Sequence, residues 1–130
     1  MKDNLVIPIS PGELIDKITI LEIKRESIVN KEKLSNINLE YKVLLETLEN
    51  KIIASNEIDS LRIKLKTINK KLWDIEDQLR DLERSKTFNE DFIKLARSVY
   101  FTNDERSEIK KSINKLLNSE IVEEKSYSKY

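Results

Sequence analysis

The sequence predicts an all-α protein, and three observations support this prediction. The chain has one glycine and two prolines among 130 residues, with 37% charged and 38% hydrophobic residues, which is typical of long helices. Eight Ile and Leu residues recur at alternating steps of three and four, the spacing of a coiled-coil seam. Three Ser/Thr-x-x-Glu sequences match the capping box that begins many helices. A chain of this length fits a single domain over residues 1–130.

The first helix is expected over residues 11–32. Both prolines and the single glycine lie in the preceding stretch PISPGE, where Pro11 suits a first helical position and Ser10 and Glu13 form a capping box. Gly12 is not needed to begin a helix, so two interpretations stay open. Gly12 packs tightly against another segment, or it leaves the helix N-terminus open to a partner or an anion.

Residues 36–54 and 57–84 are expected to form two helices that pack as an antiparallel, coiled-coil-like hairpin with flanking helices. Asn56 is expected to cap the second of them. That helix carries the aliphatic seam, which consists of Ile58, Leu61, Leu65, Ile68, Leu72, Ile75, Leu79 and Leu82. The preceding helix offers a matching stripe at Ile37, Tyr41, Leu44, Leu48 and Ile52. The alternative is that the seam faces a second copy of the chain in a homodimer.

Two further helices are expected over residues 88–101 and 103–118. Their starts are marked by capping boxes, Thr87 with Glu90 and Thr102 with Glu105.

The two ends of the chain contain short β-branched stretches at residues 4–7 and 120–123. These stretches are expected either to pair as a small terminal β-ribbon or to pack as extended segments.

Composition excludes several classes of function. Lys and Arg (24) balance Asp and Glu (24), so no overall charge attracts nucleic acid or an anionic membrane. Without cysteine or histidine, the chain has no thiolate or imidazole chemistry, and one glycine does not make a Walker or dinucleotide loop. We therefore expect no cofactor and no metal. No segment is apolar enough for a leader or a membrane span, so a soluble cytoplasmic protein is expected.

The residues most suited to ligand binding lie near the predicted junction between the last two helices. Arg97 and Arg106 would form a fork for a phosphate or carboxylate group, with Tyr100 orienting it. Lys17 and the helix end at Gly12 would complete this anion site. The alternative is structural, with the arginines pairing to carboxylates or to helix-terminal carbonyls and with Asn103 and Asp104 capping a helix.

Other residues suggest a surface for a partner protein. Trp73 follows a seam residue directly, so its ring covers the core edge or meets a partner. Lys125 and Tyr127 are further candidates near the C-terminus.

A weaker interpretation concerns catalysis by a metal. The spacing of Glu46 with Glu49 and of Asp74 with Asp77 matches the paired acidic motifs of all-α nucleoside-triphosphate pyrophosphohydrolases, which hold Mg²⁺. These carboxylates lie off the seam among positions expected to face solvent.

Four segments of the chain resemble an uncharacterised family of short helical proteins from bacteria and their phages. They are PISPGELIDKITILEIK at 8–24, LWDIEDQLRDLE at 72–83, FIKLARSVYFTNDER at 92–106 and EEKSY at 123–127. The resemblance implies a setting near glycosyltransferase and surface-polysaccharide genes, and a shared surface around Gly12, Arg97 and residues 125–127.

The sequence therefore favours a non-catalytic interaction or scaffold protein, with a protein partner or self-association. The alternative is a protein that binds a phosphate-bearing small molecule such as a nucleotide sugar, and the pyrophosphohydrolase is the weakest candidate.

Overall fold

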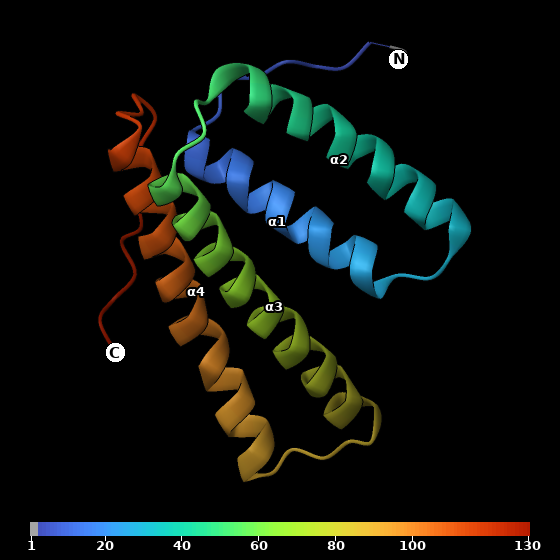
Figure 1. Cartoon of the computed structure of the whole chain (residues 1–130). Coiled ribbons are helices and arrows are strands. Elements are labelled where there is room, and N and C mark those ends of the chain that lie inside the picture. The colour runs from blue at the N-terminus through green and yellow to red at the C-terminus, as the bar shows by residue number, and fades with distance from the viewer. Residues whose placement is uncertain (1–2) are drawn as a thin grey trace.

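The computed structural model describes residues 3–130, which form four α-helices joined by short connections (Figure 1). The helices are α1 (Pro11–Ser27), α2 (Lys31–Lys51), α3 (Asn56–Arg84) and α4 (Glu90–Leu116). The all-α fold class is therefore confirmed. Within residues 3–130 no strand forms, so the stretches 4–7 and 120–123 do not make a ribbon. None of these helices has both the length and the apolar composition that crossing a bilayer requires.

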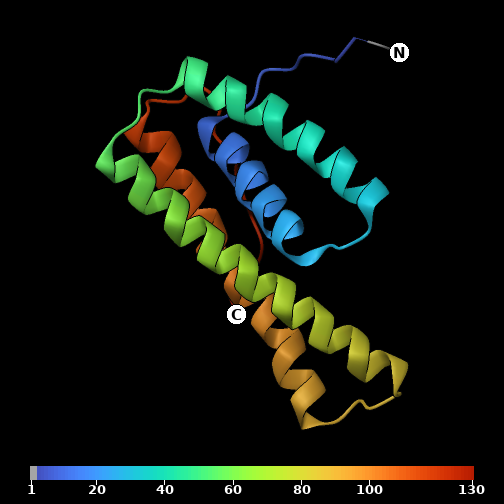
Figure 2. The same ribbon diagram turned by 45° about the vertical axis from the view of Figure 1, so that its right-hand side comes forward.

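Helix α1 is the centre of the bundle and contacts the other three helices, whereas α2 contacts only α1. Helices α3 and α4 form a long antiparallel pair whose far ends extend beyond α1 in both views (Figures 1 and 2). An antiparallel hairpin is thus present, but α4 is the partner of α3. The expected pairing of residues 36–54 with residues 57–84 is wrong.

The reason for this arrangement is the composition of α1. Eight of its 17 residues are buried, among them Ile15 and Ile23, which lie outside the single apolar stripe of an amphipathic helix. A helix that is apolar on several sides is most stable when other helices surround it. By contrast, Leu48 is the only buried residue of α2. Helix α1 therefore displaces α2 from the position beside α3.

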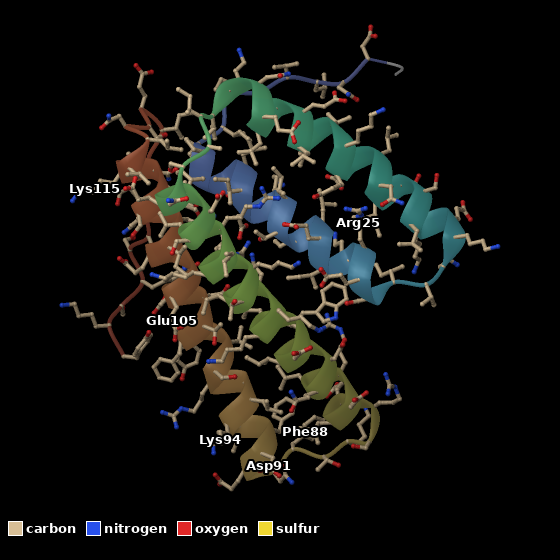
Figure 3. The ribbon with its side chains drawn as sticks, in the orientation of Figure 1. Arg25, Phe88, Asp91, Lys94, Glu105 and Lys115 are labelled. Atoms are coloured by element: carbon tan, nitrogen blue, oxygen red, sulfur yellow. The ribbon has the colours of Figure 1, made fainter. Side chains whose placement is uncertain are left out.

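Polar contacts agree with this arrangement. Arg62 and Lys66 of α3 pair with Glu22 and Glu26 of α1, not with acidic residues of α2. Helix α2 is held to α1 at Arg25, which Figure 3 shows in the angle between the two helices. The Arg25 guanidinium lies 4.3 Å from the centre of the Tyr41 ring.

The aliphatic seam of α3 is covered within the chain. All eight of its Ile and Leu residues are buried or half-buried, and Leu65 is fully enclosed. Helices α1 and α4 provide the cover. The seam is therefore not free to join a second copy of the molecule.

The helix boundaries confirm the expected cap at Ser10. The caps expected at Asn56, Thr87 and Thr102 are wrong. Ser10 caps α1, because its Oγ accepts a hydrogen bond from the Glu13 amide at 3.2 Å. Helix α3 is capped by Ser55 rather than Asn56, and α4 by Asn89 rather than Thr87.

The two helices expected over residues 88–101 and 103–118 are one continuous helix, α4. Thr102 lies in its interior and is 1% exposed, so it packs instead of capping. Because α3 offers one unbroken surface 29 residues long, packing against it favours a straight partner over the local capping signal.

Candidate functional site

A buried polar network joins α1 to α3 and α4 around Asp16, which is completely buried. The Asp16 carboxylate accepts hydrogen bonds from Nε of Arg106 at 2.9 Å and from Nη2 of the same guanidinium. It accepts a further hydrogen bond from Asn69 Nδ2 at 2.9 Å. The same Nδ2 also donates to Thr19 Oγ1, at 2.9 Å. Within residues 3–130, every fully enclosed side-chain nitrogen and oxygen has a partner. The network therefore satisfies the charges that it buries.

The role of Arg106 follows from this network. Its hydrogen bond to Asp16 raises the pKa of the guanidinium and outweighs the opposite effect of burial. Both donors that face Asp16 are occupied, and the two charges cancel. Arg106 is therefore a structural residue of the α1–α4 contact and has no net charge to offer an anion.

The N-terminus of α1 meets α4 at Gly12. The Gly12 amide donates a 2.7 Å hydrogen bond to Asn114 Oδ1, and a Cβ at this position would lie 2.6 Å from the Lys110 carbonyl oxygen. These distances confirm the interpretation that Gly12 packs tightly against another segment. The space that a ligand would need at this helix end is filled by α4.

Lys110 links this helix contact to the C-terminal tail, residues 119–130. Its ammonium bonds Glu13 of α1 at 2.8 Å and Glu123 of the tail at 2.7 Å. Burial lowers the pKa of Lys110, but the hydrogen bonds to Glu123 and Glu13 raise it by more, so the pKa lies above its ordinary value of 10.5. Lys110 is therefore charged in the folded protein at neutral pH.

We predict that replacing Lys110 by methionine lowers the free energy of unfolding by about 1.5–3 kcal/mol at neutral pH, because two charge-assisted hydrogen bonds are lost. A group whose pKa is higher in the folded than in the unfolded protein contributes its full stabilisation when the pH is below the pKa of the unfolded protein. This contribution is lost as the pH rises through the pKa of the folded protein. The difference between wild type and Lys110→Met should accordingly shrink above pH 10.5 in urea titrations.

Lys115→Met is the matched control, because Lys115 is on the same helix and points away from the bundle in Figure 3. If both variants lose the same free energy, or if the difference from wild type is independent of pH, Lys110 does not act through its two carboxylates.

The five residues predicted to bind an anion do not form one site. Arg97 and Arg106 are nine residues apart on one helix, which places them on opposite sides, at about 180°, and roughly 13 Å apart along the axis. Lys17 is exposed on α1, while Gly12 is enclosed by α4. The arrangement thus follows the structural interpretation of these residues.

The paired acidic motifs are also separated. Glu46 and Glu49 lie on α2, Asp74 and Asp77 lie on α3, and these two helices are not in contact. Within residues 3–130, no three acidic side chains are grouped so that they could hold a metal ion. The facing carboxylates that the pyrophosphohydrolase chemistry requires are therefore not assembled.

Tyr100 belongs to an aromatic surface that the sequence indicated only in parts. The ring of Tyr130 lies 5.3 Å from that of Tyr100 and 4.6 Å from that of Phe101, between ring centres. The Tyr130 hydroxyl also donates to Asp104. We call the four residues Tyr100, Phe101, Tyr127 and Tyr130 the C-terminal aromatic surface.

This surface borders a groove of about 930 Å³ between α4 and the tail, with Glu105, labelled in Figure 3, on the α4 side. Lys125 lies at the same place, 3.8 Å from Asp104 and 5.8 Å from the centre of the Tyr127 ring. The structure therefore brings together Tyr100, Lys125 and Tyr127. Sequence reasoning missed Phe101 and Tyr130, because nothing local indicates that the tail turns back along α4.

A second groove, of about 510 Å³, lies where α1, α3 and α4 meet. Trp73 and Arg106 both line it, so the structure also brings these two predicted residues together. We call it the Trp73 groove, and its other lining residues are Ile20, Ile23, Asn69, Leu72, Glu76, Asp77, Arg80, Val99 and Asn103.

Comparison with known proteins gives one match. A family model described as a family of unknown function (DUF6165) matches residues 5–130. The match covers nearly all of the chain, so the chain belongs to this family, in agreement with the resemblance to an uncharacterised family. No curated protein and no solved structure matches it.

Proposed function

We propose that this member of the DUF6165 family is a non-catalytic interaction protein that docks a partner protein on the C-terminal aromatic surface. The observation that carries the proposal is the distribution of aromatic residues. The chain has one Trp, four Tyr and three Phe, eight in all, and all lie within residues 3–130. None of the eight is buried, and four of them line one groove: the rings of Tyr100, Phe101 and Tyr130 contact one another, and Tyr127 lies beside the same groove.

Aromatic side chains ordinarily contribute most to cores and to interfaces, because each buries about 150–250 Å². Here the core is aliphatic, whereas Phe101, Tyr100, Tyr130 and Tyr127 are 38%, 42%, 71% and 83% exposed. Tyrosine is enriched among the residues that contribute most binding energy at protein interfaces. A cluster of exposed aromatic rings is therefore best explained as a surface that a partner covers.

The edge of this surface is polar, as at known interfaces. Three lysines and three carboxylates line the groove beside the rings, namely Lys111, Lys125, Lys129, Asp104, Glu105 and Glu108. Charges of both signs suit a protein partner better than a phosphate group, which the carboxylates would repel. We place this interaction in the cytoplasm and, following the family resemblance, near surface-polysaccharide or glycosyltransferase proteins.

The proposal predicts that Tyr100→Ala combined with Tyr127→Ala abolishes retention of a specific partner. The wild-type protein is used as bait in extracts of its source cell, and the retained protein is identified and purified. Isothermal calorimetry should then show at least about a tenfold loss of affinity for the double variant, which corresponds to about 1.4 kcal/mol.

Phe88→Ala is the matched control, because Phe88 is 55% exposed but lies just before α4, away from the groove that the aromatic surface borders (Figure 3). The proposal is wrong if the double variant binds as well as Phe88→Ala does. Sedimentation of the purified chain shows whether the partner is a second copy.

A further inference from the structure

A nearly buried amide side chain, that of Asn69, lines the Trp73 groove. Asn69 is 5% exposed and lines the groove, and its Nδ2 donates to Asp16 and Thr19. A carboxylate only accepts hydrogen bonds, so Asp16 fixes the orientation of the Asn69 amide and directs Oδ1 away from the network. Oδ1 accepts no hydrogen bond from the described residues.

That oxygen is not fully enclosed by the protein. Within residues 3–130, every fully enclosed side-chain oxygen has a partner, so an oxygen without one is not fully enclosed. The opening that Asn69 lines is the Trp73 groove. A buried amide oxygen facing a groove indicates that the groove takes a group with N–H donors.

Three residues present complementary chemistry along one side of α3. Asn69, Trp73 and Asp77 are spaced four residues apart, so they lie one above another on successive turns. Their side chains provide an acceptor oxygen, an aromatic ring and a carboxylate, in that order, and all three line the groove.

The charges around the groove favour a cation. Arg106 is neutralised by Asp16, and Arg80 pairs with Glu76. Asp77 is exposed and makes no ion pair with the described residues, so it is the uncompensated charge of the groove. Counting Asp16, Glu76 and Asp77 against Arg80 and Arg106 leaves one net negative charge.

We propose that the Trp73 groove is a binding site for an arginine side chain of a partner protein. The guanidinium stacks on the Trp73 ring, donates inward to Asn69 Oδ1 and donates outward to the Asp77 carboxylate. Arginine fits better than lysine, because its planar group carries five N–H donors that point in several directions and stacks on aromatic faces. This site is separate from the C-terminal aromatic surface and does not depend on it.

The test uses Trp73 as its own reporter, because it is the only tryptophan of the chain. The full-length protein is titrated at constant ionic strength with a blocked pentapeptide that has arginine at its centre. Parallel titrations use the same peptide with citrulline or lysine in that place, and methylguanidinium alone. We expect a saturable change in Trp73 emission with the arginine peptide, and binding at least about tenfold weaker with citrulline, which has the same shape without the charge.

Two matched variants separate the site from general attraction between charges. Asp77→Asn should weaken arginine-peptide binding by at least about fivefold. Asp81→Asn makes the same change of charge one turn farther along α3, outside the groove, and should leave the affinity nearly unchanged. Both positions are exposed, so both variants should fold.

The proposal is overturned if the arginine peptide gives no saturable change, if citrulline or lysine binds equally well, or if the two aspartate variants behave alike. Methylguanidinium binding as tightly as the peptide would overturn the assignment to a partner protein. The result is independent of the partner proposed for the C-terminal aromatic surface, since Tyr100→Ala with Tyr127→Ala should leave this titration unchanged.

Discussion

Replacing Asp16 by alanine is expected to destabilise the fold by about 3–5 kcal/mol, the largest effect of any single substitution that we predict. Asp16 accepts both hydrogen bonds by which Arg106 joins α4 to α1 and one of the two by which Asn69 joins α3 to α1; Thr19 accepts the other. Its removal leaves the Arg106 guanidinium half-buried without its carboxylate and takes from the Asn69 amide one of its two acceptors, and this penalty exceeds the value of an ordinary hydrogen bond. Urea denaturation followed by circular dichroism measures the change.

The control for this experiment is Asp81→Ala. Asp81 also pairs with an arginine, Arg84, but both side chains are at least 70% exposed, and such a pair contributes only about 0–1 kcal/mol. Equal losses in Asp16→Ala and Asp81→Ala would show that the buried network does not hold the helices together. Combining Asp16→Ala with Arg106→Ala should cost less than the sum of the two single changes, because the residues act as one unit.

Much of the fold was predictable from the sequence, because helix formation depends on local composition and periodicity. The aliphatic seam of α3 was identified residue by residue, and all of it is covered. The partner of the seam was not predictable in the same way. A repeating row of Leu and Ile specifies that another helix packs against it but not which one, and α2 offers a matching stripe without being the partner. Which helix lies beside α3 is decided by α1, where Ile15 and Ile23 are buried in addition to the residues of one apolar stripe. A search of the sequence for a single stripe does not show this.

The residues of the candidate site were likewise not predictable where their positions depend on contacts between distant parts of the chain. Arg97 and Arg106 were expected to form one fork because a capping signal at Thr102 predicted a break between two helices, whereas one continuous helix places them on opposite sides. Asp16 reads as an ordinary surface residue in sequence, although it lies between the buried Ile15 and Ile18. Tyr127 was recognised, but its proximity to Tyr100 depends on a tail held by long-range ion pairs such as Lys110 with Glu123.

Replacing Gly12 by alanine is expected to lower the free energy of unfolding, although helix propensity alone predicts that it should rise. In an exposed helix, alanine is more favourable than glycine by about 1 kcal/mol. Here the new Cβ would lie 2.6 Å from the Lys110 carbonyl oxygen and 2.8 Å from Asn114 Oδ1. The carbonyl belongs to the backbone of α4 and moves only if the helix moves. We therefore expect a net loss of about 1–3 kcal/mol, measured by urea denaturation.

The physical cause can be separated from a general sensitivity of this helix end by a second variant. Asn114→Ala removes the side chain that both accepts the Gly12 hydrogen bond and crowds a Cβ at residue 12. If crowding is the cause, the double variant should cost less than the sum of the single ones, because part of the clash and the lost hydrogen bond are shared. Strict additivity would mean that the Asn114 side chain takes no part in the crowding. Stabilisation by Gly12→Ala alone would mean that the Lys110 carbonyl does not crowd residue 12 either, and the enclosure of Gly12 would then no longer exclude a ligand there.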